Sequence, residues 1–135
     1  AVMTAKVHMT GGQMQVNVME RCRYKRLHVA HFKAAALPRK GGGWQWVTAT
    51  AGDGAGWPDL FICGPGGMIW REIKGPREAV LDAQRAWLEW LAESGGDADV
   101  WRPIDLESGR VERELEALRQ GVSAGQRPRT PLSTR

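Results

Sequence analysis

The chain has 135 residues and a mass of 14.9 kDa, which fits a single domain of roughly 100 to 200 residues. Its 42% hydrophobic and 25% charged residues are typical of a folded protein and argue against a generally disordered chain. No apolar run approaches the roughly 18 residues that cross a bilayer, no secretory signal pattern is present, and the two cysteines lack CxxC spacing, so we expect a cytoplasmic protein rather than a membrane or secreted one.

The N-terminal half is predicted to hold one helix and two strands. Residues 1–12 show no period, and we expect a flexible or expression-derived N-terminus there. Between 13 and 27, apolar side chains recur at helical spacing, which predicts an amphipathic helix. A short strand is expected at 28–32, followed by a basic, glycine-rich loop at 38–43 and a second strand or extended flap at 44–51.

Two apolar runs in the middle of the chain form the clearest pattern. Residues 60–63 and 68–74 are separated by Gly64-Pro65-Gly66-Gly67, which predicts a hairpin of antiparallel strands. A flexible turn, 52–56, leads into the first of these strands.

The C-terminal part is predicted to be mainly helical. Asp82 is expected to cap a helix that packs on the sheet and stops at Gly95-Gly96. A final short strand is expected at 100–103 and a charged helix at 110–120. Residues 121–135 are rich in Ser, Gly, Pro and Arg, which predicts a disordered tail, so the folded domain is expected to span 13–120.

Charge is distributed unevenly along the chain. Residues 1–40 contain eight lysines and arginines and one acid, whereas residues 41–120 contain eight basic and fourteen acidic side chains. A basic lobe beside an acidic body suits a nucleic-acid enzyme, in which one part holds phosphates and another holds metal ions. A merely solvated basic helix remains the alternative. The candidate phosphate-binding residues are Arg21, Arg23, Lys25, Arg26, Lys33, Arg39 and Lys40.

A possible catalytic group lies on the predicted hairpin. Side chains alternate across a strand, so Glu72 and Lys74 share one face, and antiparallel pairing would bring Asp59 towards them. A surface ion pair between Glu72 and Lys74 is the simpler alternative. Two acids and a lysine suit phosphodiester hydrolysis, in which carboxylates hold a divalent metal and a lysine stabilises developing charge. Hard oxygen ligands favour Mg²⁺ or Mn²⁺, and Ile73 offers its backbone carbonyl as a further ligand.

Four segments of the chain resemble one nuclease family. They are Gly56-Trp57-Pro58-Asp59-Leu60, Glu72-Ile73-Lys74, Gln84-Arg85-Ala86-Trp87-Leu88 and Val100-Trp101-Arg102-Pro103. Over roughly residues 13–106 they resemble the VRR-NUC branch of the PD-(D/E)XK nucleases. Pro-Asp followed by Glu-x-Lys is a weak signal by itself, and the Gln-x-x-Trp-Leu helix at the right distance makes the pattern fairly specific.

The resemblance implies a fold, a reaction and a set of site residues. The fold would be α/β of the α+β type, a restriction-endonuclease-like α-β-β-β-α-β core with a C-terminal helix. The reaction would be cutting of DNA with Mg²⁺ or Mn²⁺ in a bacterial or phage-infected host, where small stand-alone members act as dimeric resolvases of four-way (Holliday) junctions. Carried over to this chain, Asp59, Glu72 and the Ile73 carbonyl look like metal ligands, Lys74 looks catalytic, and Gln84 is the motif glutamine.

One position departs from the family pattern. Related sequences tend to carry a further glutamate early in the first helix, and its place here falls near Gly11, which has no carboxylate. Glu20 is the only acid before Asp53. Either Glu20 is the remaining metal ligand, the site works with fewer carboxylates, or Glu20 pairs with neighbouring arginines on the helix surface.

The tryptophans divide into two groups by position. Trp87 and Trp101 fit core positions, whereas Trp44, Trp46 and Trp57 are the candidates to touch nucleic acid or a second subunit.

The predicted function is that of a structure-selective endodeoxyribonuclease that resolves four-way junctions. A symmetric homodimer would present two active sites to two strands of such a junction. Two alternatives stay open: a non-catalytic DNA-binding module on the same fold, and a nuclease of flap or restriction specificity.

Overall fold

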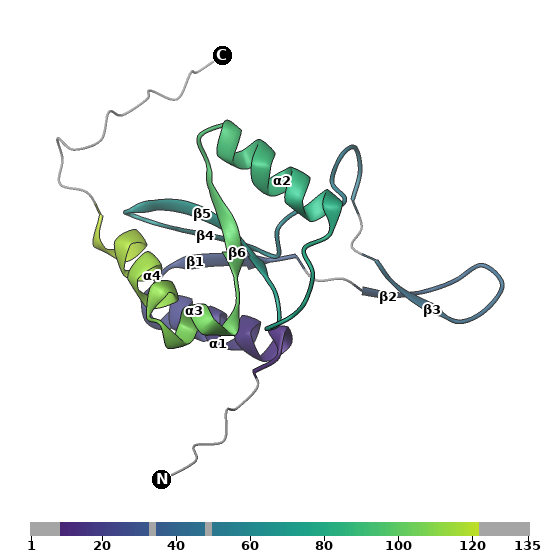
Figure 1. Cartoon of the computed structure of the whole chain (residues 1–135), viewed down its shortest axis with the longest axis horizontal. Helices are drawn as coiled ribbons and strands as arrows, with labels where there is room; N and C mark the ends of the chain where they lie inside the picture. Colours follow the sequence, from purple (N-terminus) through teal and green to yellow (C-terminus); the bar gives the residue numbers. More distant parts are fainter. Residues whose placement is uncertain (1–8, 33–34, 48–49, 122–135) are drawn as a thin grey trace, which may run out of the picture.

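A four-stranded mixed sheet forms the centre of the computed structural model, which describes residues 9–32, 35–47 and 50–121. Its strands, in spatial order, are β1 (His28–His31), β4 (Leu60–Gly64), β5 (Gly67–Ile73) and β6 (Asp97–Trp101). The first three strands pair antiparallel, and β6 is parallel to β5 because helix α2 (Asp82–Glu93) provides the crossover between them (Figure 1).

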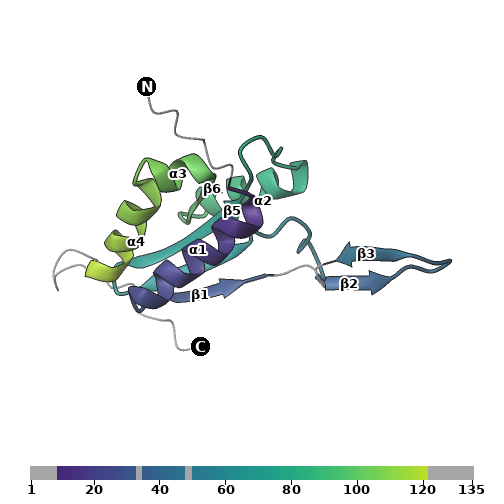
Figure 2. The ribbon, with the colours of Figure 1, turned by 90° about the horizontal axis from the view of Figure 1, so that it is seen from below.

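A second, two-stranded sheet lies apart from the first. It consists of β2 (Ala35–Pro38) and β3 (Trp44–Val47), which pair antiparallel. Figure 2 shows this hairpin extending away from the rest of the molecule. Strand β2 was not predicted from the sequence, since Ala35–Pro38 contains no β-branched residue and ends in proline.

Helix α1 (Gly11–Tyr24) begins two residues before the predicted helix because of its N-terminal cap. The Thr10 hydroxyl accepts a hydrogen bond from the Gln13 backbone N–H at 3.1 Å, and the Gln13 side chain accepts one from the Thr10 N–H at 2.9 Å. This reciprocal pair satisfies two N–H groups that the helix itself leaves without partners. The first turn of α1 therefore starts at a fixed place, next to the end of β5.

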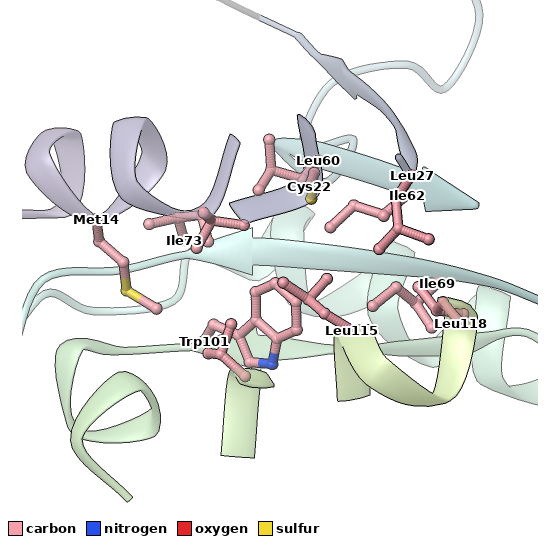
Figure 3. Close-up of a cluster of buried hydrophobic side chains, with 12 residues drawn as sticks. Met14, Cys22, Leu27, Leu60, Ile62, Ile69, Ile73, Trp101, Leu115 and Leu118 are labelled. Atoms are coloured by element: carbon pink, nitrogen blue, oxygen red, sulfur yellow. The ribbon is translucent and has the colours of Figure 1, made fainter. Parts of the chain in front are cut away.

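The hydrophobic core lies between the sheet and two helices, α1 and α4 (Arg110–Gln120) (Figure 3). Strands β4 and β5 turn their alternate apolar side chains towards these helices. The buried core residues are Met14, Val18, Cys22, Leu27, Leu60, Ile62, Ile69, Ile73, Trp101, Val111, Leu115 and Leu118.

Arg71 is a buried charge within this apolar face of β5. Its side chain is 1% exposed, forms ion pairs of 2.8 Å with Asp97 and 2.9 Å with Glu114, and lies over the Trp101 ring. Through these two ion pairs the guanidinium ties β5 to both β6 and α4, although its Nε has no hydrogen-bond partner among the described residues. Arg71 therefore anchors β5 through the face of the strand opposite to the one that carries Glu72 and Lys74.

Several predicted boundaries need correction. Leu81, rather than Asp82, is the residue that precedes α2, and Asp82 is its first helical residue. Strand β6 ends at Trp101, because Pro103 begins a short helix, α3 (Pro103–Glu107). Trp87 is half-buried in an aromatic cluster with Trp57 and Trp90 rather than in the core.

Other predictions are confirmed. The antiparallel hairpin of β4 and β5 is present, and α4 has the predicted bounds of 110–120. The chain is mixed α/β, with a helix followed by a mixed sheet and C-terminal helices, which is compatible with the predicted α+β class. The predictions for Lys33, for residues 1–8 and for the tail from 122 onwards fall outside the described residues. No helix within the described ranges is long and apolar enough to cross a membrane.

Candidate active site

The register of the β4–β5 hairpin brings Asp59 beside Glu72. Leu60 pairs with Arg71, so the residue before Leu60 lies opposite the residue after Arg71. The Ile73 N–H donates a hydrogen bond to Asp59 Oδ2 at 2.8 Å, and the Asp59 N–H donates one to Glu72 Oε2 at 3.3 Å. Each carboxylate is therefore held by the backbone of the opposite strand, and the two acids converge as the hairpin pattern predicts.

Gln84 fixes the Glu72 carboxylate from the side of α2. Its Oε1 accepts a hydrogen bond from the Leu81 N–H at 2.9 Å, and its Nε2 donates one to Glu72 Oε1, also at 2.9 Å. Both ends of the amide are used, which fixes its orientation. Moving the Gln84 amide out of water, on the face of α2 that lies against the sheet, costs free energy, and these two hydrogen bonds offset that cost.

Gly56 allows the loop before Asp59 to lie against the start of α2. It has a φ of +85°, and a Cβ atom placed on it would lie 2.4 Å from the backbone carbon of Ala83. Only glycine combines this backbone conformation with such a close approach. The Gly-Trp-Pro-Asp segment therefore brings Asp59 near the helix that supplies Gln84.

Lys74 is buried between two carboxylates and is not part of a surface ion pair. Its side chain is 4% exposed. The Nζ atom lies 3.7 Å from Glu72 Oε1 and 3.3 Å from Glu78 Oε2. A buried ammonium needs such partners, because an isolated charge would carry a large desolvation cost. The lysine is thus held next to the Asp59–Glu72 pair.

Glu78 is the site residue that the sequence pattern missed. It lies in the loop between β5 and α2, where its Oε1 accepts a hydrogen bond from the Gly75 N–H at 3.0 Å. That bond is the main reason why the pKa of Glu78 lies below the usual glutamate value. Arg102 fixes the same loop by donating to the carbonyls of Gly75, at 2.7 Å, and Glu78, at 2.8 Å.

The Glu78 carboxylate reaches the place where the first helix lacks an acid. A Cβ atom placed on Gly11 would lie 3.6 Å from Glu78 Oε1. The sequence gives little indication that Glu78 lies near Gly11 and Lys74. Glu78 follows Lys74 by four residues, but the two residues do not belong to one helix or strand whose period would bring them together. A loop residue thus puts a negative charge beside Gly11 and Lys74.

The Glu72 carboxylate is buried and lies next to the half-buried carboxylate of Asp59, so the two negative charges repel each other. Burial, followed by the negative charge of Asp59, raises the pKa of Glu72 to about 8, although the positive charge of Lys74 opposes the shift. Full ionisation of both acids is therefore unfavourable without a further cation. A divalent metal ion between them would supply that charge.

The donor set fits a hard divalent cation. Asp59 and Glu72 provide carboxylate oxygens, and the carbonyl of Ile73 is the predicted third ligand. No cluster of three or more His, Cys, Asp or Glu side chains suited to a metal occurs within the described residues. Mg²⁺ is commonly bound through one or two carboxylates, with waters and substrate phosphates completing the octahedron, so a pair is sufficient.

Glu20 does not join this site. It is exposed and lines a groove between α1 and α4 together with Asn17 and Glu112. The N-terminal end of α1, at Gly11, lies next to Gly75. Glu20 lies nine residues further along the helix, which is roughly 13 Å along the helix axis. The prediction that Glu20 is a metal ligand is therefore not supported by its position.

The predicted phosphate-binding residues fall into three groups. Arg21 and Lys25 form ion pairs with Glu112, and Lys25 also pairs with Glu116, so their charges are neutralised at the contact between α1 and α4. The exposed residues on or after α1 are Arg23 and Arg26, and those in the β2–β3 turn are Arg39 and Lys40. Lys33 lies outside the described residues.

An open groove leads from the β2–β3 hairpin to the candidate site. Its volume is about 920 Å³, and both Asp59 and Gln84 line it. Phe32, Trp46 and Trp57 contribute aromatic side chains to its walls. A groove that joins aromatic surface to the Asp59 carboxylate and the Gln84 amide has the features of a substrate-binding site.

This chain matches no protein-family model, no curated protein and no solved structure. Among the described residues, the contacts that join Asp59, Glu72, Lys74 and Gln84 are the most specific feature of the candidate site.

Proposed function

We propose that this protein is a metal-dependent endodeoxyribonuclease of the VRR-NUC branch of the PD-(D/E)XK nucleases, and that it acts on branched DNA. One observation carries the proposal: the Glu72 carboxylate accepts a hydrogen bond from the Asp59 N–H, the Asp59 carboxylate accepts one from the Ile73 N–H, and the buried Lys74 lies beside Glu72. A buried Glu72 with a half-buried Asp59 beside it is costly for a fold, and such pairs of acids are common at functional sites.

Each residue of the site has a chemical role in this reaction. Asp59, Glu72 and the Ile73 carbonyl would hold Mg²⁺ or Mn²⁺, which when bound would supply Lewis-acid chemistry to the phosphate and to a water molecule. Gln84 keeps the Glu72 carboxylate oriented. Lys74 donates its ammonium hydrogens to a phosphate oxygen and stabilises the charge that develops during cleavage.

DNA would reach this site through the groove that Asp59 and Gln84 line. Arg23, Arg26, Arg39 and Lys40 would contact backbone phosphates, as would Lys33 from its place in the sequence. Phosphate contacts position the DNA without reading its sequence, so the protein would respond to DNA shape.

Selectivity for a four-way junction would come from a symmetric homodimer. A two-fold assembly presents two equivalent active sites, and a four-way junction offers two equivalent strands to them. This part of the proposal is supported by the family resemblance.

A non-catalytic DNA-binding module is the second candidate. The observation that favours it is that the first residue of α1 is Gly11, which has no carboxylate to serve as a metal ligand. In that case the remaining acids would bind a metal weakly or not at all, and DNA would be bound without being cut.

Cleavage of labelled DNA tests the proposal. Four-way junction, flap, duplex and single-stranded substrates would be incubated with Mg²⁺, with Mn²⁺ or with a chelator, using Asp59→Asn as the control. We expect metal-dependent cutting of the junction by the parent protein and none by the variant. Binding of all substrates without cutting would support the second candidate, and preferential cutting of the flap would reassign the specificity.

A further inference from the structure

The β2–β3 hairpin exposes two large aromatic side chains. Trp44 is 71% exposed and Trp46 is 75% exposed, and the hairpin extends from the molecule as Figure 2 shows. A two-stranded hairpin is marginally stable in water by itself, and indole rings are seldom left in solvent without a use. The hairpin therefore has the character of an arm that contacts another molecule.

Both indoles lie on one face of this arm. The pairs Ala36–Trp46 and Pro38–Trp44 are directly opposite in the register, so the neighbours across the strand are small or short side chains. Residues two apart on a strand are separated by roughly 6.8 Å, about twice the 3.4 Å rise between stacked bases. Each ring thus has room to stack on a separate base.

The charge of the arm matches a polyanion. Residues 35–47 contain Arg39 and Lys40 and no acid. Both basic residues are exposed in the turn, which closes through a hydrogen bond from the Arg39 N–H to the Gly43 carbonyl at 2.9 Å. Aromatic rings beside basic side chains are the usual combination for holding single-stranded nucleic acid.

The arm is continuous with the candidate site. Trp46 lines the same groove as Asp59 and Gln84. Phe32 and Trp57 extend the aromatic lining, with ring centroids 6.1 Å apart in an edge-to-face arrangement. A strand stacked on the arm would therefore continue towards the paired carboxylates.

We propose that the β2–β3 hairpin binds unpaired nucleotides of the DNA substrate, with Trp44 and Trp46 stacking on bases and with Arg39 and Lys40 holding the adjacent phosphates. The inference rests on the proposed nuclease function, which it extends by naming the feature of branched DNA that is recognised. Unpaired bases are present at flaps, ends and distorted branch points and are absent from intact duplex, so the arm would favour branched DNA over plain duplex.

A binding experiment tests the arm separately from catalysis. The double variant Trp44→Ala with Trp46→Ala would be made in the Asp59→Asn protein, and anisotropy titrations would be run in chelator with a thymidine oligonucleotide, a splayed-arm DNA and a blunt duplex. Tyr24→Ala is the matched control, because Tyr24 is an aromatic residue that is 90% exposed on α1. Both tryptophans are exposed, so their removal leaves the hydrophobic core intact.

We expect affinity for the oligonucleotide and the splayed-arm DNA to fall by about tenfold or more, and affinity for blunt duplex to change by less than about twofold. Equal losses on all three substrates, or no loss, would overturn the proposal. Sedimentation of the same variant gives the other decisive outcome: a dimer that becomes a monomer would show that the arm is a subunit interface.

The result is independent of whether the protein cuts DNA. If the parent protein cleaves no substrate but the tryptophan variant loses affinity for unpaired DNA, the arm proposal holds and the nuclease proposal fails. If the parent cleaves DNA and the variant binds every substrate as before, the nuclease proposal holds and the arm proposal fails.

Discussion

Gln84 on α2 donates a hydrogen bond to the Glu72 carboxylate on β5, with 2.9 Å between Nε2 and Oε1. The other end of the amide is held by the Leu81 N–H. Helix α2 therefore fixes the orientation of a carboxylate that lies on a different element, and the position of this helix becomes part of the site.

Gln84→Ala is expected to weaken Mn²⁺ binding by about tenfold, because partners that orient a ligand typically contribute 10- to 100-fold to metal affinity. Calorimetric titration would measure the change, and Asp59→Asn should lose binding to a greater extent. Arg85→Ala is the control, because Arg85 is the exposed next residue of α2. Equal affinity in the parent and in Gln84→Ala would mean that the amide serves only to cap the helix.

The stability of the metal-free protein is expected to fall as the pH rises from about 5 to about 8. The folded pKa of Glu72, about 8, lies above the ordinary value of 4.5, so between these values the folded state binds a proton that the unfolded state does not. Each pKa unit corresponds to about 1.4 kcal/mol, so the free energy of unfolding should decrease by an amount on the order of 3 to 4 kcal/mol between about pH 5 and about pH 8. Urea unfolding at several pH values would measure this decrease.

Glu72→Gln should remove most of this pH dependence, since an amide does not ionise. Glu89→Gln, at an exposed position of α2, is the matched control and should retain it. If the stability of Glu72→Gln still declines over the same pH range, the pH dependence comes from another titratable group.

The β4–β5 hairpin and the helices α1, α2 and α4 were predictable because their signals are local. The two apolar runs around Gly64-Pro65-Gly66-Gly67 have the length and spacing of paired strands, and the antiparallel register follows from them. Once that register is known, Asp59 must lie near Glu72. The β2 strand gave no such signal, because Ala35–Pro38 forms a strand only by pairing with β3.

The rest of the site depends on contacts between distant segments. Glu78 acts through the closure of the β5–α2 loop, which Arg102 fixes from beyond β6. Arg21 and Lys25 had the pattern of a phosphate-binding helix face, but carboxylates of α4 neutralise them from 91 residues away. Charge counted along a sequence does not show which charges are paired in the fold.

Glu78→Ala is expected to slow cleavage by about tenfold while DNA affinity changes little, because Lys74 would lose the carboxylate 3.3 Å from its ammonium group. Glu78→Asp should recover part of the rate, which a merely structural loop residue would not do. Single-turnover cleavage and anisotropy titration would separate the two effects, with Arg77→Ala, an exposed neighbour in the same loop, as the control. A parallel loss of DNA affinity would assign Glu78 to the fold of the loop instead.

Arg21→Ala combined with Lys25→Ala is expected to lower stability by about 1 kcal/mol and to leave the salt dependence of DNA binding unchanged, because both residues pair with α4 carboxylates. Arg23→Ala combined with Arg26→Ala should instead reduce the slope of log affinity against log salt by about 0.9 for each phosphate that the variant no longer neutralises. If the first pair flattens the slope as much as the second, the ion pairs with α4 must open when DNA binds.

The most direct test of the nuclease proposal is single-turnover cleavage of a labelled four-way junction in Mn²⁺ by the parent protein and by Lys74→Met. Methionine keeps most of the buried volume of lysine and removes its charge, so the fold and DNA binding should persist. We predict metal-dependent cutting by the parent and a rate at least about 100-fold lower for the variant. A Lys74→Met protein that binds the junction normally and cuts it at the parent rate would contradict the assignment of Asp59, Glu72 and Lys74 as the active site.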